Sequence, residues 1–244
     1  MTMEKNEYAL DYVLQAEYNL LRKQFIPGII VIPSGKSNLI WNGVHFVSQG
    51  PYEGGVFRFS IVIPNTFPDS DCPKVLFLSS IYHPQIDEHT GELDIKRYFP
   101  VWKRNGHHLW QVLRYIRRIF QKIEATNAIN LNAAHLYEQD PEIFLSKVSE
   151  CVNESKSKLY NSDPSISDDP HAILFSPWSD KLQTVRQLLL SGKKKTFSPI
   201  DTNQKENSTS CKCPCCMCMF TKLTKRSLFF FQSNNACLFL TMIS

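Results

Sequence analysis

The stretch that decides the fold runs from Tyr82-His83-Pro84-Gln85 through Gly91-Glu92-Leu93-Asp94 to Trp102. An apolar run at residues 75–78 precedes it, and a strongly amphipathic run at residues 109–123 follows it. Proline and glycine mark turns, so the stretch between the two runs should be a loop. A strand and a helix that flank a loop must each bury an apolar face. We therefore expect a rigid loop packed on a layered core.

Upstream of this loop, short runs of strand-forming residues alternate with turn signals. The clearest run is residues 57–63, where Phe or Ile occupies every second position. We expect four strands, at residues 29–32, 39–47, 57–63 and 75–78. Asn42-Gly43 is a hairpin signal, but its flanks are short, so we interpret residues 39–47 as one continuous strand. Successive short strands predict an α+β fold, with a four-stranded antiparallel meander covered on one face by helices.

Apolar periodicity and chain breaks predict helices before and after the strands. We place them at residues 8–23, 109–123, 132–138, 141–160 and about 179–190. The apolar side chains of the first helix are expected to be Leu10, Val13, Leu14 and Leu21, widened by Ala9, Ala16 and Leu20. Asp140-Pro141-Glu142 is typical of a helix start, with Asp140 as the N-cap. The helix at 109–123 has a basic face that is either simply solvated or docks an acidic partner: Arg114, Arg117, Arg118 and Lys122.

Composition indicates a globular body and a different tail. The chain has 244 residues, of which 43% are hydrophobic and 20% charged, as in proteins with a buried core. Residues 191–244 hold eight of the 27 Lys and Arg and two of the 23 Asp and Glu, leaving 19 basic and 21 acidic residues in the body. A near-neutral body predicts no nucleic-acid binding. Six of the eight cysteines lie in the tail, and the first residues lack a signal-peptide pattern. We therefore expect a cytoplasmic protein without a transmembrane segment.

The order of these features resembles the ubiquitin-conjugating enzyme fold, also called the E2 or UBC core. Residues 51–57, Pro-Tyr-Glu-Gly-Gly-Val-Phe, resemble the family's turn into its third strand. Phe67-Pro68 lies where the family has a proline-rich connector, and His83-Pro84-Gln85 stands where it has His-Pro-Asn. Trp102 follows position 94 by eight residues, as a Trp follows the family's catalytic cysteine. Each match is weak alone, but together and in this order they are specific.

The resemblance covers residues 8–160 and implies an E2 core that lacks E2 catalysis. The cysteine position reads Asp94, and a carboxylate cannot hold ubiquitin as a thioester. Gln85 replaces the asparagine that donates to the oxyanion, and its longer side chain would misplace the donor. We therefore expect no catalytic residue and no cofactor. The rest of the degenerate site would be structural: His83, Pro84 and Trp102.

The first helix gives a second expectation through the same resemblance. Active E2s use basic residues of this helix to dock their activating enzyme. Here Glu7, Asp11 and Glu17 outweigh Arg22 and Lys23. Surface charge rejects wrong partners, so docking to the activating enzyme should be poor.

Among E2 variants, the chain resembles the fused-toes group, which includes AKT-interacting protein and the insect crossbronx proteins. The residues that carry this match are Gly91 to Arg97, Trp102 to Asn105, His108 to Leu113, and Phe175 to Trp178. The resemblance implies an adaptor in vesicle trafficking with Hook-type coiled-coil partners, and membrane association only through partners. Two alternatives stay open: a regulatory subunit of an active E2, and a ubiquitin- or peptide-binding module.

The expected domain organisation is a UBC core at residues 8–178, an extension with a helix to about residue 190, and a disordered tail at 191–244. The tail contains a dense run of thiols, Cys211, Cys213, Cys215, Cys216 and Cys218. Soft metals suit such a run, but no second pair completes a zinc site unless Cys237 contributes. Metal binding, S-acylation and no function stay open for this run. Residues 227–244 are uncharged, but the polar residues 232–235 argue against a membrane anchor.

The histidines give a further candidate metal site, made of His83, His89, His107 and His108. Adjacent histidines point apart, and no cysteine or carboxylate at a suitable spacing completes the ligand set. We therefore expect no metal at these residues.

Overall fold

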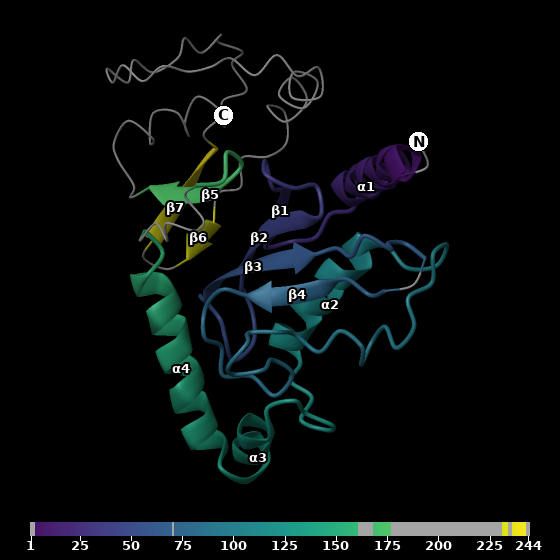
Figure 1. The fold of residues 1–244 in the computed structure, drawn as a ribbon. Coiled ribbons are helices and arrows are strands. Elements are labelled where there is room, and N and C mark those ends of the chain that lie inside the picture. The colour runs from purple at the N-terminus through teal and green to yellow at the C-terminus, as the bar shows by residue number, and fades with distance from the viewer. Residues whose placement is uncertain (1–2, 70, 161–167, 177–230, 234–235, 243–244) are drawn as a thin grey trace, which may run out of the picture. The chain divides into compact units, whose positions relative to one another are not determined.

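The computed structural model describes residues 3–69, 71–160, 168–176, 231–233 and 236–242 (Figure 1). The chain divides into two compact units, residues 1–174 with 242–244, and residues 175–241. The first unit contains the described helices and the four-stranded sheet. The loop from Tyr82 to Trp102 therefore belongs to the first unit.

The first unit has an α+β architecture with the predicted order of elements. In chain order these are α1 (Met3–Lys23), β1 (Ile29–Pro33), β2 (Ile40–Phe46), β3 (Val56–Val62), β4 (Lys74–Phe77), α2 (Leu109–Gln121), α3 (Leu131–Gln139), α4 (Pro141–Ser157) and β5 (Ile173–Ser176). Strands β1 to β4 pair antiparallel in sequence order, which confirms the predicted meander. Most bounds differ from the prediction by one or two residues, and two differ by more, since α1 begins at Met3 and α4 ends at Ser157. Asp140 occupies the N-cap of α4, but its side chain makes no capping hydrogen bond.

Strand β2 is continuous through Asn42-Gly43, as predicted. Gly43 pairs with Val31 on one side and with Phe59 on the other. A Cβ at residue 43 would lie 2.4 Å from the Phe59 ring. The glycine therefore makes room for a core aromatic ring, and no hairpin turn forms there.

Helix α2 supplies the central aromatic ring of the core. Phe120 stacks on Phe57 of β3 with ring centroids 5.2 Å apart, and meets Phe77 of β4 at 5.7 Å. In β3 the side chains alternate between buried and half-buried, because successive residues of a strand point to opposite faces. The apolar face of the sheet thus packs against α2, as the alternation predicts.

Helix α1 buries a narrower face than its apolar pattern predicts. Its buried side chains are Leu14, Glu17, Tyr18 and Leu21. Tyr18 packs edge-on against Trp41 of β2, with ring centroids 5.5 Å apart. Ala9 and Ala16 were expected to widen the apolar stripe, but both are exposed. The expectation fails because the side of α1 that packs against Trp41 excludes them.

The segment before β5 is tied to the start of the sheet. Asp169 accepts the Gly35 N–H at 2.9 Å and the Asn42 side-chain amide at 3.0 Å. Arg58 of β3 donates to the Ile173 carbonyl at 2.6 Å. Burial works to raise the pKa of Asp169, but its hydrogen bonds prevail and hold it below the usual value. This segment follows α4 in the sequence and is bonded to the four-stranded sheet, so the fold continues beyond the last described helix.

In the second unit, β6 (Phe231–Ser233) and β7 (Ala236–Met242) pair antiparallel. These strands lie within residues 191–244, for which the sequence predicts a disordered tail, and that prediction stays a prediction. The helix expected at 179–190, the domain limit at 178 and the thiol run lie outside the described residues. Among the described residues, no helix is long and apolar enough to cross a lipid bilayer.

Candidate functional site

The loop after β4 is held by backbone hydrogen bonds to that strand. Leu93 donates to the Val75 carbonyl and Phe77 donates to the Gly91 carbonyl, both at 2.9 Å. Gly91 has φ +70°, and a Cβ there would lie 2.4 Å from the Phe77 carbonyl oxygen. Only a glycine fits so close to the neighbouring backbone with this φ. The loop is therefore rigid at the residues that lead to Asp94.

A second anchor joins the loop to the turn between β2 and β3. Tyr52 is fully buried, and its hydroxyl donates to the Tyr82 carbonyl at 2.6 Å. The Tyr52 ring also lies 5.6 Å from the His83 ring, measured between centroids. The turn and the loop, two motifs far apart in the sequence, thus meet in one place.

His83 fixes the conformation of the loop. Its ring is fully buried, its Nδ1 accepts the Gln85 backbone N–H at 2.9 Å, and its Nε2 faces the Ile119 carbonyl at 3.1 Å. Because Nδ1 accepts, Nε2 carries the proton and donates. Burial lowers the pKa of His83 to about 4, against the effect of the Ile119 hydrogen bond. The neutral ring therefore uses both nitrogens to hold backbone.

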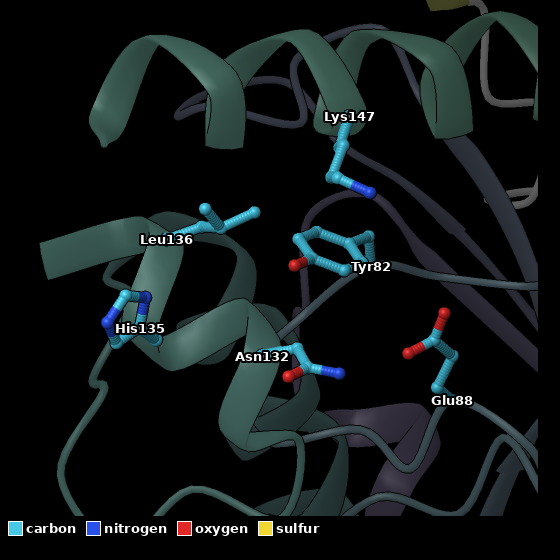
Figure 2. Close-up of a pocket in the computed structure, with 6 residues that line it drawn as sticks. All are labelled: Tyr82, Glu88, Asn132, His135, Leu136 and Lys147. Carbon is cyan, nitrogen blue, oxygen red and sulfur yellow. The ribbon is translucent and has the colours of Figure 1, made fainter. Parts of the chain in front are cut away.

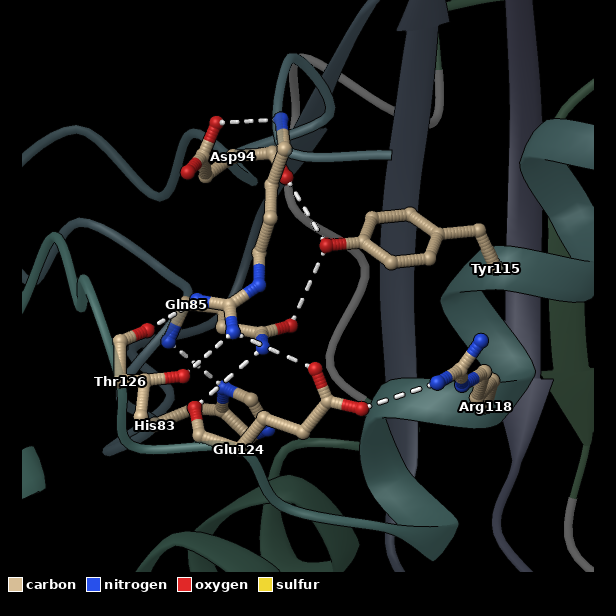
Figure 3. Close-up of polar contacts among 8 residues, drawn as sticks. His83, Gln85, Asp94, Tyr115, Arg118, Glu124 and Thr126 are labelled. Carbon is tan, nitrogen blue, oxygen red and sulfur yellow. Dashed lines mark hydrogen bonds and ion pairs between the residues drawn. The ribbon is translucent and has the colours of Figure 1, made fainter. Parts of the chain in front are cut away.

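The Gln85 side chain is hydrogen-bonded inside the protein (Figure 3). It is 2% exposed. Its Nε2 donates to the Glu124 carbonyl at 3.3 Å, and its Oε1 accepts the Tyr115 hydroxyl at 3.2 Å. Burial, with the nearby Asp94 charge, raises the pKa of Tyr115 to about 12, so this hydroxyl stays a donor. Both ends of the amide have partners inside the protein, so the side chain is oriented toward the Tyr115 hydroxyl and the Glu124 carbonyl.

Asp94 forms hydrogen bonds with the backbone of residues before and after it in the sequence. Its N–H donates to the Gln85 carbonyl at 3.0 Å, and its Oδ1 accepts the Arg97 N–H at 3.3 Å. The second contact caps the turn that follows, as Asp commonly does. The Tyr115 hydroxyl also lies 3.0 Å from the Asp94 carbonyl. A half-buried carboxylate in this position stabilises the turn and cannot form a thioester, which requires a thiol.

An ion-pair network closes the site beside Gln85. Glu124 accepts from Arg97 at 3.3 Å through Oε2 and from Arg118 at 2.9 Å through Oε1. Arg97 also donates to the Thr126 hydroxyl at 2.9 Å and to the Thr126 carbonyl. Sequence reasoning missed Glu124, Thr126 and Tyr115. Residues 124 and 126 follow a helix without any periodic pattern, so no local signal could have found them.

Trp102 is the buried end of the loop. It lies in an aromatic cluster with centroid distances of 5.5 Å to Phe99, 5.6 Å to Phe67 and 5.4 Å to His107. Its Nε1 has no hydrogen-bond partner among the described residues. The spacing that identified Trp102 therefore reflects packing of the loop end.

Cys72 and Cys151 are poor nucleophiles. Cys151 in α4 accepts the Tyr82 N–H at 3.4 Å, and burial raises its pKa. Burial likewise raises the pKa of Cys72 to about 11. Acyl transfer needs a thiolate. Neither thiol has the depressed pKa of a catalytic cysteine.

The histidines of the sequence do not gather. His83 contacts backbone, His107 packs edge-on against Trp102, and His108 contacts Glu17. Within the described ranges, no group of three or more His, Cys, Asp or Glu side chains could hold a metal.

Glu17 corrects the expected charge of the first helix. It is 7% exposed, and its Oε2 accepts the Leu109 N–H at 2.9 Å while its Oε1 lies 2.7 Å from His108 Nδ1. The carboxylate thus sits at the N-terminus of α2, where the helix dipole favours negative charge. The expectation that Glu17 adds to an acidic docking surface is wrong, because this side chain points inward. Asp11 remains exposed on α1.

A hollow of about 350 Å³ lies on another side of the loop, between it and α3 and α4 (Figure 2). The residues that line it are Tyr82, Glu88, Asn132, His135, Leu136 and Lys147. Lys147 Nζ lies 4.9 Å from the Tyr82 ring centroid, a cation–π contact. Sequence reasoning did not predict this hollow, because its residues come from three separate segments.

A comparison with protein families decides the kind of fold that holds this loop. A family model described as ubiquitin-conjugating enzyme matches residues 13–152, more than half of the chain. The chain belongs to the ubiquitin-conjugating enzyme family. A solved E2 domain of a Toxoplasma gondii ubiquitin-conjugating enzyme has a similar fold, with a TM-score of 0.52 and 22% identity over 59% of this chain and 97% of that one.

Curated relatives place this E2-family chain in the group of AKT-interacting protein, as predicted. It is 46% identical to AKT-interacting protein homolog A of Xenopus laevis over 190 residues, 78% of this chain. It is 46% identical to AKT-interacting protein of Mus musculus over 188 residues, 77% of this chain. In both cases the match covers 64% of the relative, so this chain spans less than two thirds of the length of these relatives. The chain is thus a UBC-like variant of this group.

Proposed function

We propose that this chain is a catalytically inactive E2 variant that acts as a protein-interaction adaptor in vesicle trafficking, with Hook-type coiled-coil proteins as partners. The proposed lack of catalysis rests on the hydrogen bond that the Asp94 carboxylate makes. Its carboxylate caps the turn to Arg97 at 3.3 Å where the family has its nucleophile. The relatives' name, AKT-interacting protein, records protein binding for those proteins and supports a binding role here.

The loop geometry supports loss of the oxyanion donor as well. Gln85 is tied to Tyr115 and to the Glu124 carbonyl. A donor that must reach a developing oxyanion has to be aimed at it beforehand. Because the site has two defects, we expect that a single substitution at position 94 does not restore transfer.

The test of inactivity is a thioester assay. The full chain is incubated with activating enzyme, ATP and labelled ubiquitin, and products are separated with and without reducing agent. We expect no thiol-sensitive adduct, and also none above a trace with Asp94→Cys, because Gln85 remains engaged. An active E2 is the positive control. Robust charging of the natural chain would refute the proposal, and robust charging of Asp94→Cys would show that Gln85 and the charge of the first helix matter less than we infer.

The test of the adaptor role is binding of the purified full chain to recombinant Hook-type proteins. We expect a stable complex by size-exclusion chromatography. No co-elution at micromolar concentration would remove Hook-type partners from the proposal.

A regulatory subunit of an active E2 is the second candidate, because the UBC scaffold around the loop is intact. Tyr52, His83 and Trp102 all keep their buried positions. The discriminating measurement is ubiquitin-chain synthesis by a panel of active E2s with and without this chain. Stimulation would favour this candidate, and no change across the panel would exclude it.

A further inference from the structure

The outer side of α2 and its C-cap carries a stripe of cations, defined here as Arg114, Arg117, Arg118 and Lys122. Three of them are exposed and Arg117 is half-buried. The first and last of them are eight positions apart, which corresponds to about 12 Å along a helix. Helix α2 contains no Asp or Glu. The stripe therefore concentrates positive charge on a body whose overall charge is near neutral.

The nearby acids are used in other contacts. Glu17 of α1 is turned inward to the Leu109 N–H. Glu124 is shared between Arg97 and Arg118. In the part of the chain that the structure describes, Arg114, Arg117 and Lys122 form no ion pair. Most of the charge on the stripe is thus available to a partner.

Arg114 is held in place before any partner binds. Its guanidinium lies 4.5 Å from the Trp110 ring centroid, and it donates to Gln24 Oε1 at 3.2 Å. A planar guanidinium fixed by stacking keeps further N–H groups free for a carboxylate. Such preorganisation reduces the entropy that binding would otherwise cost. Gln24 directly follows Lys23, an exposed residue at the end of α1, which adds a cation next to the stripe.

The charge and chemistry of the possible binding partners limit what can dock on the stripe. The chain's own segment 191–244 has eight basic and two acidic residues, so the stripe repels it. Arg114 covers a face of Trp110, so that face is not open to a stacked base. The stripe carries no apolar side chain for insertion into a bilayer. A protein segment with regularly spaced carboxylates fits all of these features.

We propose that this cationic stripe docks an acidic helix of a partner protein, with carboxylates repeating every three to four residues. Side chains at that spacing share one face of a helix, about 5–6 Å apart, and so match the steps of the stripe. The inference rests on the proposed adaptor function and names the face and the chemistry of its partner.

The test uses the full chain and a labelled synthetic helical peptide with Glu at every third or fourth position. A peptide of identical composition, with Glu distributed around the helix, is the control ligand. Arg114→Glu and Lys122→Glu reverse exposed charges of the stripe, and Lys103→Glu makes the same change at an exposed residue elsewhere. Binding is measured by fluorescence anisotropy at two salt concentrations, and circular dichroism verifies folding of each variant.

We expect each stripe variant to weaken binding of the first peptide about tenfold, and Lys103→Glu to weaken it less than about twofold. Affinity should fall with added salt. Equal losses in all three variants, or equal affinity for both peptides, would overturn the proposal. Tighter binding of single-stranded oligonucleotides or of phosphatidylserine vesicles would overturn it too, as would a stripe-dependent dimer of this chain. If Hook-type proteins bind and the stripe variants leave that complex intact, the adaptor role stands and the stripe proposal fails.

Discussion

The contact between Glu17 and the start of α2 gives the sharpest stability prediction. Glu17→Gln keeps the shape of the side chain and removes its charge. A hydrogen bond to a charged group contributes about 1.5–3 kcal/mol, against about 0.5–1.5 kcal/mol for a neutral one. Loss of charge at a helix N-terminus adds about 0.3–1 kcal/mol. With the two contacts at 2.9 and 2.7 Å to Leu109 N and His108 Nδ1, we expect a destabilisation of about 2 kcal/mol.

The matched control is Asp11→Asn, which removes one acid from the same helix. Asp11 is exposed, and its Oδ1 accepts the Asn38 side-chain amide at 3.2 Å. An exposed substitution of this kind changes stability by less than about 0.5 kcal/mol. Both variants of the full chain are unfolded with urea and followed by circular dichroism. In thermal melts, a destabilisation of about 2 kcal/mol lowers the unfolding midpoint by about 4–8 °C.

The comparison of the two variants decides the interpretation. Equal stability of Glu17→Gln and Asp11→Asn would refute the view that Glu17 joins α1 to α2. A further variant, Glu17→Ala, should lose more than Glu17→Gln, because it also leaves the Leu109 N–H without its acceptor.

Two other predictions concern the core. Gly43→Ala should destabilise the protein by about 1–3 kcal/mol, since its Cβ would lie 2.4 Å from the Phe59 ring. Gly106→Ala is the control in the same urea titration, because the nearest atom to its Cβ would be 3.7 Å away, and equal losses would contradict the argument. Burial, with a smaller effect of Arg117, lowers the pKa of His45 to about 3. The unfolded state therefore takes up a proton between about pH 6.5 and pH 3 that the folded ring refuses, so the contribution of His45 to stability is complete above about pH 6.5 and decreases as pH falls. Between pH 7 and pH 5 this loss is about 2 kcal/mol, and urea midpoints of His45→Phe should show a shallower pH dependence than the wild type; an unchanged slope would contradict it.

The fold could be predicted because its signals are local. Alternation in β3 places one face of the strand in the core, and turn residues separate the strands. The exception within this pattern, Asn42-Gly43, is a hairpin signal that tertiary packing overrides, since Phe59 occupies the space that a side chain would need. Propensity is a weak guide where a neighbouring strand supplies a large ring.

The sequence could predict only the part of the site that is continuous in the chain. The spacing from His83 to Trp102 located the loop, but the residues that close it come from elsewhere. Glu124 reaches Arg97 across 27 positions, and Tyr115 reaches Gln85 across 30. Glu17 was counted as surface charge for the same reason, since its hydrogen-bond partners lie 91 and 92 positions away. Contacts over such separations leave no periodicity in a single sequence.

These long-range contacts bear on whether the loop could recover an enzymatic role. In a transfer site the polar groups around the nucleophile stay available for charge that develops during reaction. Here the Gln85 amide already has partners at both ends, and Asp94 accepts the N–H of its own turn. Replacing Asp94 with cysteine would remove the turn cap and free neither end of Gln85. A thiol at position 94 would therefore lack the capped turn that presents it, and the Gln85 amide would still be oriented toward Tyr115 and Glu124, which supports the proposed loss of transfer activity.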